Sequence, residues 1–129
     1  MSGRELWSTH PDDLALLDGD RLRERFVVED LFSPGQLTFA YAHDDRLLIG
    51  GVTLRGERVR LAAPAVLRAD FFLERRELAV VGIEGAPTVI ADGTPFVVGR
   101  HDVLYLPMGT RAVDFDGEGR SGFDFTVTM

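Results

Sequence analysis

The stretch that decides the fold covers residues 85–109 and reads GAPTVIADGTPFVVGRHDVLYLPMG. Two short apolar runs flank Asp92-Gly93, a pair that favours a type I′ hairpin turn because both central residues of that turn have positive φ. Gly99 and Asp102 predict a second turn, which leads into the run VLYLP. Pro107-Met108-Gly109 predicts a third. The stretch therefore predicts three consecutive short strands joined by tight connections.

The same alternation of short apolar runs and turn residues continues along the chain from Phe26 onward. Turn residues recur roughly every 8–12 positions, a spacing typical of antiparallel sandwiches and barrels. Pro34-Gly35 and residues 117–122 are expected to be further turns. The runs expected to form strands are FVVEDLF, QLTFAYA, RLLIGGVTL, RVRLA, DFFLERREL, LAVVGIEG, TVIADG, PFVVG, DVLYLP, RAVDF and FDFTVT. The phenylalanines expected to fill the core are Phe26, Phe32, Phe39, Phe71, Phe96, Phe115, Phe123 and Phe125.

A helix is expected only within the first twenty residues. Pro11 suits a first helical turn, and either Thr9 or Asp12 is expected to cap it. Gly19 is expected to end the helix, and a further turn over residues 21–25 is left open. We therefore expect an amino-terminal arm with a short helix over residues 1–20 and a β-barrel over residues 21–129.

The composition fits one soluble domain of 129 residues. The net charge is -7, from 21 acidic residues against 14 arginines, and this balance argues against binding to nucleic acid or to an anionic membrane. Cysteine is absent, which excludes a disulfide framework and a thiolate site. Every apolar run is shorter than the roughly 20 residues that span a bilayer. We expect a cytoplasmic protein.

The order of turns in residues 85–109 resembles the second half of the cupin signature, a hairpin followed by G-x-x-D-x-x-x-x-P-x-G. The resemblance implies an all-β fold, a cupin-type (RmlC-like) β-barrel or jelly roll with a short amino-terminal helix. Such closure limits the exposed edges that many short antiparallel strands would otherwise leave.

Three further segments resemble the opening domain of the 5-keto-4-deoxyuronate isomerases, also called 4-deoxy-L-threo-5-hexosulose-uronate ketol-isomerases. They are HPDDLALLDGDRLRERFVVEDLF (residues 10–32), YAHDDRLLIGG (residues 41–51) and FFLERREL (residues 71–78). The match extends from about His10 to Thr128. The resemblance implies bicupins that assemble as hexamers and interconvert 5-dehydro-4-deoxy-glucuronate and 3-deoxy-2,5-hexodiulosonate in the breakdown of pectin and related polyuronates. It also implies a zinc site of three His and a Glu in a second barrel.

This barrel is expected to hold no metal of its own. Glu77 lies about where the cupin Glu belongs, but residues 70–72 occupy the position of the His-x-His pair and Ala112 that of the late His. The three histidines lie far apart in sequence and share no ligand spacing. Zinc is therefore expected only in the second barrel of the family.

The segment FLERREL, residues 72–78, has two interpretations. In the catalytic one, Glu74 or Glu77 moves a proton between adjacent carbons, while Arg75 or Arg76 pairs with a uronate carboxylate. In the packing one, which we prefer, these four residues form an Arg–Glu network against a neighbouring strand or a second barrel. Charged residues in a strand often line a wet face or an interface, and no metal is expected here to polarise a carbonyl.

His43 and Arg46 are further candidates for substrate binding, in a loop HDDR. The alternative is a turn between strands, which Asp favours. Gly50-Gly51, within the apolar run that follows, predicts a bulge or a close approach of another backbone. Trp7 lies outside the expected barrel.

Two functions remain open. One is the amino-terminal barrel of a 5-dehydro-4-deoxy-glucuronate ketol-isomerase, inactive alone, whose partner is a second cupin barrel or another copy of the chain. The alternative is a stand-alone, non-metal cupin that binds a uronate-type sugar acid or serves in assembly.

Overall fold

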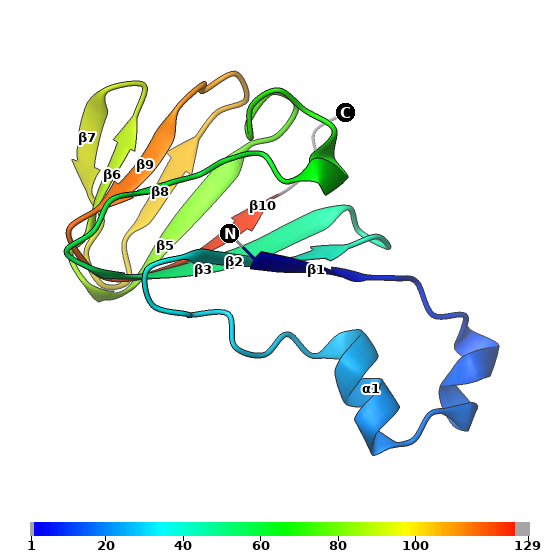
Figure 1. Cartoon of the computed structure of the whole chain (residues 1–129). Helices are drawn as coiled ribbons and strands as arrows, with labels where there is room; N and C mark the ends of the chain where they lie inside the picture. Colours follow the sequence, from blue (N-terminus) through cyan, green and yellow to red (C-terminus); the bar gives the residue numbers. More distant parts are fainter. Residues whose placement is uncertain (1, 126–129) are drawn as a thin grey trace.

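The computed structural model describes residues 2–125, which form ten strands, one α-helix and two short 3₁₀ helices (Figure 1). In chain order the elements are β1 (Ser2–Leu6), η1 (Pro11–Leu16), α1 (Gly19–Phe26), β2 (Leu37–Ala42), β3 (Leu47–Arg55), β4 (Val59–Arg60), η2 (Ala65–Leu67), β5 (Leu78–Gly85), β6 (Thr88–Ala91), β7 (Thr94–Val97), β8 (Val103–Leu106), β9 (Val113–Asp116) and β10 (Glu118–Phe125). No described helix is long and apolar enough to cross a membrane.

The strands form two sheets. The larger sheet has the order β1-β2-β3-β10-β5-β8, and the smaller one has the order β4-β9-β6-β7. β1 pairs with β2 in parallel, whereas the other neighbouring strands pair antiparallel. This arrangement confirms the all-β, cupin-type fold that the turns predicted.

Alternation along the strands builds the core between the sheets. In β3, Leu48, Val52 and Leu54 are buried, and in β5 Leu78 and Val80 are buried, because every second side chain of a strand points to the same face. Each such side chain contributes about 1.5–3 kcal/mol by leaving water. A charged residue at Val80, which is fully buried, would therefore break the sheet packing.

The turns predicted within residues 85–109 are confirmed. Asp92 and Gly93 both have positive φ, 46° and 84°, and join β6 to β7. The backbone N–H of Gly99 donates to the Asp102 carboxylate over 2.9 Å, which closes the turn into β8. Gly109 has φ of 93° in the turn that follows β8.

Two predicted strands are wrong. FVVEDLF forms no strand, and DFFLERREL forms bends and turns up to residue 77. In the second segment, the consecutive residues Phe72 and Leu73 are both buried within a turn. The segment is therefore an irregular one that inserts two neighbouring side chains into the core.

Residues 117–122 were expected to be a turn, yet β10 begins at Glu118. Gly119 shows why glycine stands in this strand, since a Cβ there would lie 2.6 Å from the Glu84 carbonyl oxygen. Gly51 confirms the predicted close approach in β3, because its Cβ would lie 2.8 Å from the Leu31 carbonyl oxygen. At both positions glycine marks close packing.

The amino-terminal prediction needs correction. Residues 11–16 form a 3₁₀ helix, and the His10 ring, not Thr9 or Asp12, accepts from the N–H of Asp12. Gly19, expected to end a helix, begins α1 instead, because Asp18 accepts from the Arg21 N–H over 2.8 Å. The expected boundary at residue 20 therefore falls inside α1. β1 was also missed, since SGREL carries no apolar alternation.

The phenylalanines divide between core and surface. Phe115 is fully buried and Phe39 packs against the core, as predicted, whereas Phe26 and Phe96 are exposed. Phe72, which was not predicted, is a core residue at 3% exposure. The side chains of Phe123 and Phe125 lie outside the described residues.

Candidate functional site

Glu77 lies directly before β5 and bonds to the neighbouring strand. Its carboxylate accepts a hydrogen bond from the hydroxyl of Tyr105 on β8, across the β5–β8 pair. This hydrogen bond is the main cause that raises the pKa of Tyr105, and burial and the negative charge of Glu77 add to it. The carboxylate is therefore already occupied by a protein donor.

Arg76 is buried at 8% exposure and lies 5.3 Å from the centre of the Tyr41 ring. One guanidinium nitrogen donates to the backbone carbonyl of Arg46 over 3.2 Å. A cation over an aromatic face is attracted by the ring quadrupole, and here the attraction acts away from water. Arg76 thus fastens the irregular segment before β5 to the β2–β3 hairpin.

His43 lies against the Tyr41 ring and extends the contact between Arg76 and Tyr41 toward the surface. Its ring meets Tyr41 edge-on at 4.8 Å between centroids and lies parallel to Trp7 at 3.8 Å. Its Nε2 also lies 3.3 Å from the Glu5 carboxylate. Arg76, the pair Tyr41 and His43, and Trp7 come from three separate parts of the sequence and form one column with Trp7 at its exposed end.

Glu74 and Arg75 form a separate, local group. Arg75 Nε lies 3.6 Å from the Glu74 carboxylate, and its terminal nitrogen donates to the carbonyls of Leu67 and Arg68, the latter over 2.5 Å. Arg68 has φ of 48°, so these contacts hold a left-handed turn after η2. The pair supports the backbone of its own loop.

The six predicted residues therefore divide into three groups. The structure brings His43, Arg46 and Arg76 together, places Glu77 beside Tyr105, and leaves Glu74 with Arg75. A cavity of about 630 Å³ lies apart from them, between the segment 4–9 and residues 21, 24 and 25 of α1. As a set, the candidates contact protein groups rather than facing a common cavity.

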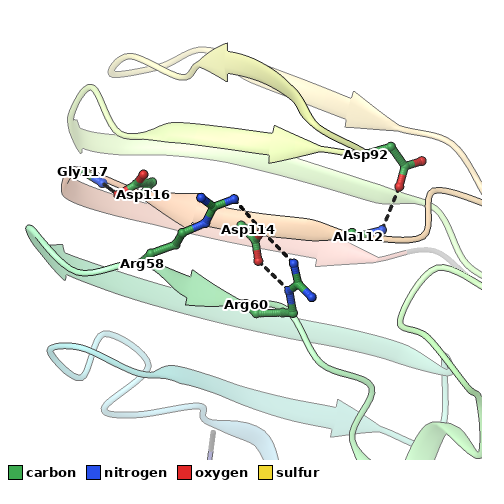
Figure 2. Close-up of polar contacts among 7 residues, drawn as sticks. All are labelled: Arg58, Arg60, Asp92, Ala112, Asp114, Asp116 and Gly117. Carbon is green, nitrogen blue, oxygen red and sulfur yellow. Dashed lines mark hydrogen bonds and ion pairs between the residues drawn. The ribbon is translucent and has the colours of Figure 1, made fainter.

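Sequence reasoning missed Asp114, which is buried at 4% exposure on β9. Arg60 donates to both of its carboxylate oxygens, at 2.8 and 3.1 Å, and Arg58 donates at 2.9 Å (Figure 2). The hydrogen bond from Arg60 is the main cause that lowers the pKa of Asp114, Arg58 adds to it, and burial opposes it. The alternation RVR in a short strand was the available signal.

Asp92 is a second carboxylate that the sequence reasoning assigned only to a turn. It accepts from the backbone N–H of Arg111 at 3.0 Å. It also accepts from the backbone N–H of Ala112 at 2.9 Å (Figure 2). The hairpin tip is therefore tied to the segment that enters β9.

The described residues do not fit a zinc ion. They contain no group of three or more His, Cys, Asp or Glu placed to hold a metal. Glu77, at the cupin ligand position, bonds to Tyr105, while His43 stacks on Trp7 and His10 caps η1. The metal implied by the family is therefore given no role in this barrel.

Curated relatives of the chain carry the name 4-deoxy-L-threo-5-hexosulose-uronate ketol-isomerase. The protein of that name from Halalkalibacterium halodurans is 39% identical over 115 residues, which are 89% of this chain and 42% of the relative. The one from Cereibacter sphaeroides is 44% identical over 104 residues, which are 81% of this chain and 38% of the relative.

Over most of its length, the chain is related in sequence to these ketol-isomerases. The resemblance inferred from residues 10–32, 41–51 and 71–78 is thereby confirmed. The chain spans about two fifths of the length of the curated relatives that it matches. That share is consistent with an amino-terminal domain of a longer protein.

Solved structures resemble this chain in fold alone. A conserved protein of unknown function from Streptococcus pyogenes aligns with a TM-score of 0.51 at 13% identity, over 79% of this chain and 87% of that one. An RmlC-like cupin protein from Desulfovibrio desulfuricans aligns with a TM-score of 0.49 at 14% identity, over 70% of this chain and 80% of that one. No family model matches the chain.

Proposed function

We propose that this chain is the amino-terminal barrel of a cytoplasmic 5-dehydro-4-deoxy-glucuronate ketol-isomerase, which acts in the breakdown of pectin and related polyuronates. The observation that carries the proposal is the identity of 38–44% to curated ketol-isomerases over 81–89% of the chain. In this proposal, the zinc site lies in a second cupin barrel, which belongs to the part of the longer protein that this chain does not include.

The reaction moves one hydrogen between adjacent carbons and one proton from the hydroxyl oxygen to the former carbonyl oxygen. It needs a base for the proton and a group that polarises the carbonyl. Within the described part of the chain, Glu77 is held by Tyr105 and Glu74 by Arg75. We therefore assign the four charged residues of FLERREL to packing and assembly, and the chemistry to the second barrel.

The test is an aldose–ketose assay with zinc, on this chain alone and after mixing with a polypeptide that carries the second barrel of a relative. We expect no turnover above background from the chain alone. We expect Arg75→Ala and Glu77→Ala to lower stability or self-association without acting on any turnover of the lone chain. Glu84→Ala, an exposed position of β5, is the matched control.

One result would place the active site in this barrel. Clear turnover by the lone, metal-free chain that disappears in Glu77→Ala but persists in Glu84→Ala, with both variants folded by circular dichroism, contradicts the assignment. Turnover by a longer relative that persists after its second barrel has been removed contradicts the assignment as well.

A further inference from the structure

Residues 7–27 form a projection that leaves the barrel after β1 and returns to it through α1 (Figure 1). No residue of the projection is buried, so it adds nothing to the core. Surface segments that a rigid scaffold holds often carry binding residues. The projection encloses the cavity of about 630 Å³, which falls within the roughly 300–1,000 Å³ typical of small-molecule sites.

Contacts across the cavity hold its two walls together. Arg4, on β1, donates to the backbone carbonyls of Glu24 and Val27 at the carboxyl end of α1. The guanidinium of Arg25, on α1, donates to the Thr9 hydroxyl over 3.5 Å. The cavity is therefore formed by bonded contacts between α1 and the chain that runs out of β1.

One wall of the cavity carries two positive charges. Arg21 and Arg25 are four residues apart in α1 and therefore share a helix face, and both line the cavity. Among the described residues, neither guanidinium has an ion-pair partner. A guanidinium presents a planar fork of N–H donors that matches a carboxylate. This wall is therefore suited to bind a carboxylate from outside the chain.

Trp7 supplies an apolar surface to the same cavity. His43 lies parallel to the indole at 3.8 Å and covers one of its faces. Because the Trp7 side chain is nevertheless 66% exposed, its other face is open. The contacts of His43 with Tyr41 and with Glu5 fix the position of the indole. The open face can pack against the CH face of a sugar ring, which is flat and apolar.

Glu24 distinguishes between two classes of anion. It lies between Arg21 and Arg25 in α1 and also lines the cavity. A phosphate ester carries nearly two negative charges and offers mainly acceptors, so a neighbouring carboxylate repels it. A sugar acid carries one carboxylate for the arginines and several hydroxyl donors for Glu24. The mixed lining therefore favours a sugar acid over a phosphate ester.

We propose that this cavity binds a sugar acid, with the carboxylate at Arg21 and Arg25 and the ring on the open face of Trp7. Binding leaves the sugar acid chemically unchanged. The site is separate from the isomerisation, which is assigned to a second barrel, so its test requires no turnover.

Trp7 is the one tryptophan of the chain, so its fluorescence reports on the site directly. The whole chain is titrated with D-galacturonate. The comparison ligands are D-galactose, which lacks the carboxylate, and inorganic phosphate, which lacks the ring. We expect saturable binding of galacturonate with a Kd of about 1 mM or below, and binding of both comparison ligands at least about tenfold more weakly.

Two double variants with the same change in charge test the arginines. Arg21→Gln with Arg25→Gln removes both charges from the cavity. Arg23→Gln with Arg100→Gln is the control, since Arg23 pairs with Glu29 and Arg100 lies in the exposed turn before β8. We expect the first double variant to bind galacturonate at least about tenfold more weakly and the control to stay within about twofold.

Calorimetry tests the stacking surface without the fluorophore. Trp7→Ala should also bind galacturonate at least about tenfold more weakly than the wild type, because the ring of the ligand loses the apolar face on which it packs. Wild-type affinity in this variant would contradict the proposed pose.

Three further results would overturn the proposal. They are the absence of a saturable signal up to about 50 mM galacturonate, binding of galactose or phosphate as tight as that of galacturonate, and equal affinities of the two arginine double variants. If Arg21→Gln with Arg25→Gln fails to fold by circular dichroism, amide chemical shifts of the wild type decide the question. Shifts centred on residues 4–9 and 21–25 support the site, and shifts centred elsewhere contradict it.

Discussion

Asp114 shows how much at the scale of single residues depends on partners distant in sequence. Its carboxylate is nearly fully buried, and its ion pairs come from Arg58 and Arg60, more than fifty positions away. Both arginines keep most of their side chain in water. The Asp114 carboxylate is therefore the group that loses its hydration in the fold. Its charged form is stable because two guanidinium groups hydrogen-bond to it.

Asp114→Asn should lower the free energy of unfolding at neutral pH by about 1–2 kcal/mol, since the amide loses the charge and one of its groups becomes a donor. The folded pKa of Asp114 lies below its ordinary value of 3.8, so its contribution is present above that pH and is lost as the pH falls through the folded pKa. Denaturant melts from neutral pH to below 4 check this. Asp70→Asn, an exposed control, should change little, and a penalty for Asp114→Asn that is constant in pH would contradict the ion-pair account.

Tyr105 gives a spectroscopic test of the contact with Glu77. Its folded pKa is raised above 10.0, so the stability supplied by the neutral phenol is present below that pH and is lost as the pH rises through the folded pKa. In Glu77→Ala, the ionisation midpoint of Tyr105 should fall toward 10.0. Ultraviolet titration beside Tyr105→Phe, which identifies the signal, measures the shift. An unmoved midpoint would mean that the two groups do not interact in solution.

The sequence identified Glu77, His43 and Arg76 as residues of interest but not what they contact. Each contact joins segments that only the fold brings together: β5 with β8, and the β2–β3 hairpin with Trp7 or with the segment before β5. Residue type predicts the chemistry that a side chain can perform. The partner that occupies the side chain follows from the strand register, which a single sequence does not contain.

At the scale of elements, the turns were predictable and the irregular segments were not. Asp92-Gly93 specifies its turn locally, because few residue pairs adopt positive φ twice in succession. Residues 70–77 are rich in apolar and charged residues, as a strand is, yet they form bends and turns around the buried Phe72 and Leu73. α1 was misplaced for a local reason, since Asp18 is as good a cap as Thr9 or Asp12.

Gly93→Val should lower the free energy of unfolding by roughly 1–3 kcal/mol, because a β-branched residue resists the φ of 84° that Gly93 adopts. The strain is confined to the backbone, since a Cβ at Gly93 would meet no atom within 4 Å. Thr94→Val, the next residue, is the matched control and should stay within about 0.5 kcal/mol. Thermal melts compare the two, and an unchanged midpoint in Gly93→Val would argue against the hairpin turn.

At the scale of the whole molecule, a cupin barrel without a cupin metal site leads to a direct expectation. The purified chain should retain far less than one zinc per molecule after dialysis, because the described residues contain no group of three or more His, Cys, Asp or Glu placed to hold a metal. Elemental analysis against a chelator-treated sample measures this. One tightly held zinc per chain would show that ligands gather in a way that the described residues do not.

The order of the strands affects how the barrel folds during its synthesis on the ribosome. β10 is the last of the described strands in chain order, yet it lies in the middle of the larger sheet, between β3 and β5. Until residues 118–125 emerge, β3 and β5 each present an unpaired edge, and the nascent chain is open to wrong pairing. Closure then joins β10 to a strand made some seventy residues earlier, a distant pairing of the kind that slows folding. The barrel is therefore completed late. Until β10 has been synthesised, the unpaired edges of β3 and β5 are the sites where a holdase chaperone would bind.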